Sequence, residues 1–278
     1  MKFAVLRGRA HLVSSDCSAL ADIETISGGT ISSDPNYCFS VWDQVQALAK
    51  QKHNYNIPCI PSELDAPSPR PPQMFGIGLN YRSHALESGM DIPKTPLTFP
   101  KFLSSVNSPN GDIPIDSSTV DFESELVVVI AKPGRDIATE NAWSHIAGVC
   151  PGQDISDRGV QFASVPPQFG LGKSKRGYSP FGPWLTTPDE IPNKEELAIL
   201  CTVNGEEMQN STTGDLIFPV SDIIHYLSSI VELLPGDVIF TGTPGGVGVS
   251  RKPPVFLKSG DTVVTTLAGV GSITNRCI

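Results

Sequence analysis

A proline-rich segment from Pro58 to Gln73 constrains this 278-residue chain more than any other feature of its sequence. Six of the sixteen residues in the segment are proline. Proline has no backbone N–H and a fixed φ angle, so such a stretch cannot supply a regular ladder of hydrogen bonds to a sheet. We therefore expect an extended linker with a boundary near residue 70. The chain is long enough for a small domain over residues 1–70 and a larger one over residues 71–278.

Short strands dominate the elements that the rest of the sequence predicts. Glycine and proline each occur 25 times, which favours many turns over a helical bundle. One helix is expected to begin at Ser40, which would be its N-cap, and another is expected from about Ser221 to Glu232. In both segments apolar residues recur with helical spacing. Asn204-Gly205 is typical of a type I′ hairpin turn. Strands are expected over residues 1–8, 10–13, 120–131, 237–244 and 261–271. The predicted class is α+β, with a small N-terminal α/β domain.

The charge and cysteine content exclude several classes of protein. The net charge is −9 and no run of lysine and arginine occurs, so nucleic acid is not an expected partner. Six scattered cysteines form no CxxC pair, which favours free thiols in a reducing compartment. Arg7 and Arg9 interrupt the place where a signal peptide would need an apolar run. The longest aliphatic stretch, 126–131, is too short to cross a membrane. We expect a cytoplasmic protein without a membrane partner.

Three carboxylates are candidates for a metal site. Glu123 and Glu125 are two apart in a predicted strand, so both side chains point to the same face. Their charges repel unless a cation lies between them. Asp154 follows a small apolar run that predicts the end of a second strand. Carboxylates without nearby histidine or cysteine suit a hard cation such as Mg²⁺, Mn²⁺ or Ca²⁺. Spacing alone also fits a solvent-facing strand edge for the glutamates and a turn-capping role for Asp154.

A histidine and a glutamate are candidates for acid–base chemistry. His84 and Glu87 are three residues apart, so on one helical turn they could hydrogen-bond. An imidazole oriented by a carboxylate is a common general base. A surface His–Glu pair without a function fits the same spacing. Gly76, Gly78 and Gly89 flank the pair and suggest a mobile segment that could act as a lid.

Two glycine-rich stretches occupy residues 169–183 and 241–248. The first contains GxGKS, but its glycines stand too close to Lys173 for a nucleotide-binding P-loop. We expect these glycines to let backbone amides approach an anionic ligand, with Lys173 adding a positive charge.

Together these segments resemble the fumarylacetoacetate hydrolase superfamily. The resemblance covers residue 75 to the C-terminus, roughly three-quarters of the chain, and rests on the order of several motifs. These are GLNYRSHALESG, VDFESELVVVI, GQDISDRGVQ, GKS with PFGPWL, VNGEEMQ, LLPGDVIFTGTPGGVG, FLKSGDTV and GVGSITN. The resemblance implies a mixed β-roll in the larger, catalytic domain and a homodimer. The chain departs from the usual pattern over residues 153–161 and 175–178, which border the substrate pocket.

The resemblance also implies roles for individual residues. Glu123, Glu125 and Asp154 match ligands of Mg²⁺ or Mn²⁺, with Ca²⁺ as a further occupant. His84 and Glu87 match a pair that activates water. The residues that match substrate contacts are Lys173, Tyr81, Arg158, Gln161 and Thr243.

The expected activity is metal-dependent hydrolysis of a C–C bond in a small acylpyruvate-like oxo-acid, through a metal-stabilised enolate. Such compounds are typical of aromatic catabolism. The presence of both His84 and Glu87 favours hydrolysis, because hydrolysis needs an activated water. The alternatives on the same site are decarboxylation of an oxaloacetate-type acid and isomerisation or hydration of a 2-oxo-dioate, because one fold can host each of these reactions. A non-catalytic metal-binding scaffold and a nucleotide-binding protein are alternatives from other classes.

Overall fold

The computed structural model describes residues 1–278 and contains one large mixed sheet. Its strands follow the order β4-β3-β2-β1-β14-β11-β10-β17-β6-β7, with β5 paired to β1. The pairing of β17 with β6 is parallel and the other pairings are antiparallel. The strands are β1 Lys2–Leu6, β2 Arg9–Val13, β3 Ala19–Asp22, β4 Ile57–Pro58, β5 Leu64–Asp65, β6 Met74–Gly78, β7 Leu97–Pro100, β10 Ser124–Ile130, β11 Ile146–Gln153, β14 Leu185–Thr186 and β17 Val238–Phe240.

Smaller sheets and short helices complete the molecule. A four-stranded sheet has the order β16-β15-β18-β19, and two short pairs join β12 to β9 and β13 to β8. These strands are β8 Val106–Asn107, β9 Val120–Asp121, β12 Ser156–Asp157, β13 Ser179–Pro180, β15 Ala198–Val203, β16 Glu206–Thr212, β18 Thr262–Leu267 and β19 Gly271–Arg276. The α-helices are α1 Ile23–Ile26, α2 Pro35–Ser40, α3 Trp42–Ala49, α4 Arg82–Ser88, α5 Arg158–Gln161, α6 Phe169–Gly172 and α7 Val220–Ile230. None of them is both long and apolar enough to cross a membrane.

The central strand β10 explains why the large sheet has a core on each face. Every residue of β10 is buried, and successive side chains of a strand point to opposite faces. Val127 and Val129 pack into a core that reaches Phe3 and Trp42 of the N-terminal region. Leu126, Val128 and Ile130 pack into a second core together with residues of α7. The sequence SELVVVI therefore belongs in the middle of a sheet that is covered on both faces.

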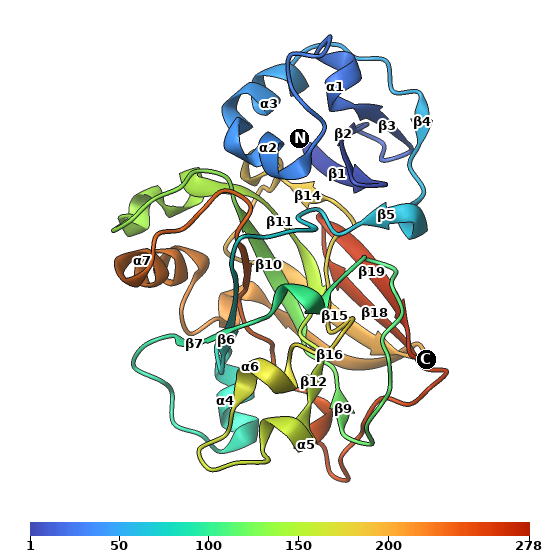
Figure 1. Cartoon of the computed structure of the whole chain (residues 1–278). Helices are drawn as coiled ribbons and strands as arrows, with labels where there is room; N and C mark the ends of the chain where they lie inside the picture. The colour runs from blue at the N-terminus through green and yellow to red at the C-terminus, as the bar shows by residue number, and fades with distance from the viewer.

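The N-terminal region shares the large sheet with the rest of the chain. Its strand β1 pairs with β14, and its aromatic residues contribute to the same core as β10. The region lies at one end of the molecule, while α4, α5 and α6 gather at the other end (Figure 1). The proline-rich segment contains the short strand β5 and the last residue of β4, so it is not wholly irregular. A boundary near residue 70 stays a prediction.

The predicted N-cap at Ser40 is wrong. Ser40 is the last residue of α2, and α3 begins at Trp42 after Val41. The earlier helix arises because the Asp34 side chain accepts hydrogen bonds from two amides of the first turn and Pro35 occupies the first helical position. The later predicted helix is confirmed as α7, which ends two residues earlier than expected.

The predicted strand over residues 120–131 is divided in the structure. It forms β9 and β10, with Phe122 and Glu123 between them, because the amides of these two residues donate to the side chains of Asp121 and Gln153 and not to a strand backbone. The predicted hairpin turn is confirmed, since Asn204 and Gly205 have φ angles of 54° and 83° between β15 and β16.

Candidate active site

Three buried carboxylates meet where β10 begins and β11 ends. The two strands are antiparallel, and Ser124 pairs with Gln153, so Glu123 and Asp154 become neighbours. Ligand oxygens of Glu123, Glu125 and Asp154 all lie within 4.8 Å of one another. The structure therefore brings together three residues that sequence spacing could only suggest.

Three cations surround this carboxylate triad. Lys173 Nζ lies 2.6 Å from Glu123 Oε2 and 2.8 Å from Asp154 Oδ2. Arg158 Nη2 lies 2.6 Å from Glu123 Oε1. Lys101 Nζ donates to Asp154 Oδ1 and to the Lys173 carbonyl oxygen, and the Lys101 side chain is completely buried. Lys101 was missed in the sequence. The available signal was a lysine directly after the short stretch LTFP, which is too common a pattern to identify a site.

The charges of the triad are unevenly compensated. Burial alone would raise the pKa of Glu123, but Lys173 and Arg158 outweigh burial and lower that pKa to about 2. Burial raises the pKa of Glu125, and the nearby Asp154 and Glu123 raise it further. Glu125 has one hydrogen bond, from Gly242 N at 2.8 Å, and no ion pair. An oxygen-rich set in which Glu125 has no cation partner fits a hard divalent cation.

The helix α4 places an imidazole on another wall of the site. His84 Nδ1 lies 2.7 Å from Glu87 Oε1, which confirms the predicted pairing on one helical turn. Glu87 Oε2 also accepts a hydrogen bond from Gly246 N at 2.8 Å, so Glu87 fixes the ring relative to the 243–248 loop. With Nδ1 donating to the carboxylate, Nε2 is free to accept a proton.

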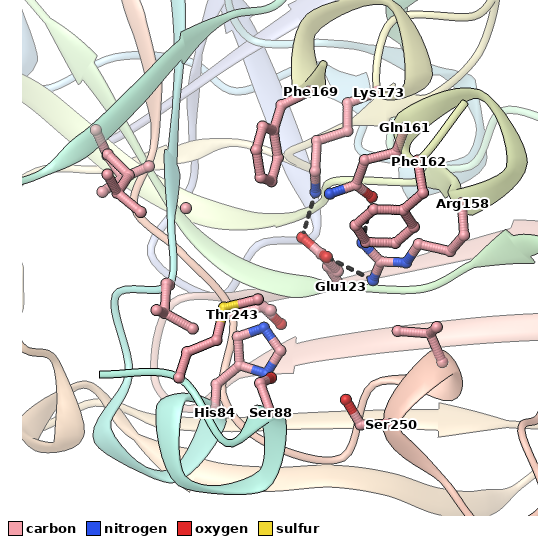
Figure 2. Close-up of a pocket in the computed structure, with 16 residues that line it drawn as sticks. His84, Ser88, Glu123, Arg158, Gln161, Phe162, Phe169, Lys173, Thr243 and Ser250 are labelled. Carbon is pink, nitrogen blue, oxygen red and sulfur yellow. Dashed lines mark hydrogen bonds and ion pairs between the residues drawn. The ribbon is translucent and has the colours of Figure 1, made fainter. Parts of the chain in front are cut away.

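A pocket of about 120 Å³ connects the imidazole with the triad. A pocket of this kind, with a few polar groups among apolar walls, suits a small acid. Figure 2 shows His84 on one side of the pocket and Glu123 between Lys173 and Arg158 on the other. Apolar side chains form much of the remaining wall, among them Leu79, Leu97, Phe162 and Phe169.

Four of the five residues that were predicted to contact the substrate line this pocket. Arg158, Gln161, Lys173 and Thr243 line it. Tyr81, directly before α4, does not line it; its side chain is completely buried and its hydroxyl has no hydrogen-bond partner. Direct contact between Tyr81 and a substrate stays a prediction, as do the roles of the others.

Comparison with known proteins assigns the chain to a family. The family model described as fumarylacetoacetate (FAA) hydrolase C-terminal matches residues 73–278. The chain belongs to the fumarylacetoacetate hydrolase family. It is therefore an enzyme of a family that includes hydrolases, isomerases and tautomerases.

Relatives in the fumarylacetoacetate hydrolase family carry several activities. The chain is 42% identical over 238 residues to the mitochondrial oxaloacetate tautomerase FAHD2A of Bos taurus, covering 84% of this chain and 74% of that protein. A Mycobacterium smegmatis protein assigned as HpcE has a similar structure, with a TM-score of 0.94, 44% identity and coverage of 100% of this chain and 99% of that chain. A Sphingobium maleylpyruvate hydrolase in complex with manganese(II) and pyruvate has a TM-score of 0.79 and 26% identity, over 100% and 99% of the chains.

Three glycines of the 241–248 stretch donate hydrogen bonds to carboxylates of the same protein. Gly242 N donates to Glu125, Gly246 N to Glu87 and Gly248 N to Asp121, at 2.7–2.8 Å. These three amides are therefore already used by the chain itself. Binding of an anionic ligand by other amides of the 241–248 stretch stays a prediction. In the other stretch, a Cβ on Gly172 would come within 2.9 Å of Gln161 N, so this glycine allows α6 to pack on α5.

Proposed function

We propose that this enzyme isomerises the enol and keto forms of a small 2-oxo acid of the oxaloacetate type. The observation that carries the proposal is one pocket lined by an imidazole and by the edge of a buried carboxylate triad. The similarity to a bovine oxaloacetate tautomerase supports this reaction over hydrolysis, which the sequence favoured.

A divalent cation is part of the proposal. Glu123, Glu125 and Asp154 would hold it, and the lack of an ion pair on Glu125 supports that assignment. Mg²⁺ and Mn²⁺ suit such oxygen ligands, and Ca²⁺ could bind the same set. When bound, the cation supplies Lewis-acid stabilisation of negative charge on the 2-oxo oxygen.

Proton transfer is assigned to His84. Converting the enol to the keto form moves one proton from the enol oxygen to C3, so it consumes neither water nor another reactant. His84 Nε2 can accept and return this proton while Glu87 stabilises the imidazolium ring. Lys173 lines the pocket, and its ammonium group, which donates to Glu123 and Asp154, would stabilise negative charge on the substrate between the two transfers.

Hydrolysis of a C–C bond in an acylpyruvate is the second candidate. The His84–Glu87 pair could activate a water molecule for this reaction. The apolar wall with Leu97, Phe162 and Phe169 suits an acyl group. Hydrolysis differs from isomerisation in needing a water molecule and releasing two products.

The two reactions can be separated with purified protein and Mn²⁺. One assay follows loss of enol absorbance of oxaloacetate, and the other follows pyruvate released from acetylpyruvate. We expect a metal-dependent isomerisation rate that falls about 10²–10⁴-fold in His84→Ala, the usual contribution of a general base. His145→Ala removes an imidazole remote from the pocket, hydrogen-bonded to the Lys132 carbonyl oxygen, and serves as a control. Hydrolysis without isomerisation would favour the second candidate, and neither activity would favour a scaffold.

Two other expectations remain proposals. A homodimer is implied by the family resemblance. The cytoplasm is favoured by the free cysteines, whereas the bovine relative is named mitochondrial.

A further inference from the structure

Two buried glutamines hold the backbone that carries the glutamates of the triad. Glu123 N donates to Gln153 Oε1 and Ser124 N donates to Gln209 Oε1, both at 2.9 Å. Both glutamine side chains are buried. Each amide therefore bonds to a buried side chain, and not to water or to the backbone of a neighbouring strand.

The other end of each glutamine is also fixed. Gln153 Nε2 donates to Thr265 Oγ1 at 2.7 Å. Gln209 Nε2 donates to Thr243 Oγ1 at 2.7 Å and to the Pro244 carbonyl oxygen at 2.9 Å. Thr243 Oγ1 in turn donates to the Ser124 carbonyl oxygen at 2.9 Å. Gln209, Thr243 and Ser124 thus form a closed ring of hydrogen bonds.

A β-bulge accompanies the placement of Gln209 at the triad. In the β15–β16 pairing, Cys201 lies opposite Gln209 and Thr202 lies opposite Glu207, so Met208 is an extra residue. Bulges commonly redirect a side chain next to a functional site. Gln209 ends the motif VNGEEMQ, which has no other role in the proposed reaction.

We infer that Gln153 and Gln209 are positioning residues that preform the carboxylate triad for its cation. The three carboxylates repel one another, so a free backbone would let them separate. Two side-chain amides fixed at both ends oppose this separation. The four-stranded sheet contributes no carboxylate to the triad, yet it supplies Gln209 from β16 and Thr265 from β18. The inference rests on the metal site of the proposed function.

Manganese affinity measured without substrate tests the inference. Free Mn²⁺ would be titrated by electron paramagnetic resonance in the wild type, Gln153→Met and Gln209→Met. We expect about 10–100-fold weaker binding in each variant, the usual effect of losing a partner that orients metal ligands. Asn275→Leu is a matched control, because Asn275 is a buried amide that binds the Pro109 and Gly111 carbonyl oxygens elsewhere. It should lower the Tm without changing Mn²⁺ affinity.

Equal Mn²⁺ affinity in the wild type and both glutamine variants, with a lower Tm, would overturn the inference and leave the metal site intact. Absence of Mn²⁺ binding by the wild type would overturn the metal site and the inference together. If the methionine variants do not fold, Thr265→Val keeps the shape of the side chain and removes the hydroxyl that Gln153 binds. We then expect Mn²⁺ affinity to fall by about three- to tenfold, less than in the glutamine variants, because Gln153 itself remains in place. Unchanged affinity would again overturn the inference.

Discussion

Arginine–carboxylate pairs occur at both ends of the molecule but in opposite surroundings. In the N-terminal region, Arg9 binds Asp22 at 2.8 and 3.0 Å, and the Arg9 side chain is 51% exposed. At the pocket, Arg158 binds Asp121 at 2.9 Å and Glu123 at 2.6 Å, and its side chain is 7% exposed. Water can replace a partner of Arg9, whereas loss of Arg158 leaves carboxylates buried without their cation.

The buried side chains of the N-terminal region and of the pocket end also differ in kind. The N-terminal region packs Phe3, Phe39 and Trp42 with ring centroids 5.3–5.5 Å apart. The pocket end instead contains buried lysines, an arginine and carboxylates. Apolar packing stabilises the first region, while the second gives up stability to hold charges where a cation and an anionic substrate can use them.

Removal of the metal should have the largest effect. Chelation is expected to lower activity about 10³-fold or more, because the cation contributes several kcal/mol of charge stabilisation. Added Mg²⁺ or Mn²⁺ should restore the rate. Glu125→Gln should weaken Mn²⁺ binding strongly, whereas Asp22→Asn in the N-terminal region should leave it unchanged. Full activity in chelated enzyme would disprove the proposed mechanism.

Removal of each arginine tests the comparison directly. Arg158→Met should lower the free energy of unfolding by about 3–5 kcal/mol, because it leaves buried carboxylates uncompensated. Arg9→Met should cost about 1 kcal/mol or less, because Arg9 is half exposed and Asp22 keeps its hydrogen bonds from Thr25 and Ser33. Urea denaturation of both variants without metal measures the difference. Equal losses would show that burial does not distinguish the two pairs.

Replacement of the pocket lysine should act mainly on the reaction. Lys173→Met should raise the activation barrier by about 2–4 kcal/mol, the range for one preorganised electrostatic group. Steady-state kinetics should show the loss in kcat, since the charge develops during the reaction. An effect confined to KM would assign Lys173 to substrate binding alone.

A buried carboxylate without a cation gives the smallest predicted effect. Burial raises the pKa of Asp237 to about 6, and its Oδ1 has no partner. Because the folded-state pKa exceeds the unfolded value near 3.9, the contribution of Asp237 to stability is lost as pH rises from about 4 to 6. The stability difference between Asp237→Asn and wild type should therefore shift by about 1–3 kcal/mol in favour of the variant between pH 4 and pH 7. A constant difference in urea denaturation across that range would contradict the raised pKa.

Local patterns predicted several elements correctly. The apolar run after Glu125, the Asn204-Gly205 turn and the stripe of α7 appear where expected, because each depends on neighbours close in sequence. The His84–Glu87 contact was predictable for the same reason. The helix α2 up to Ser40 and the break after Asp121 were not, because side-chain hydrogen bonds of Asp34 and Asp121 outweigh apolar spacing there.

The sequence by itself determined the family, the strand-rich class and the residue types that can bind a cation and move a proton. Only the tertiary structure decided which charges meet. Lys101 joins Asp154 across 53 positions, and Gln209 reaches Ser124 across 85. The physical reason is that such contacts depend on sheet order and strand register, which arise from packing the whole chain. A short segment of sequence records the spacing of its own side chains, but not which distant side chain will neutralise or hold them.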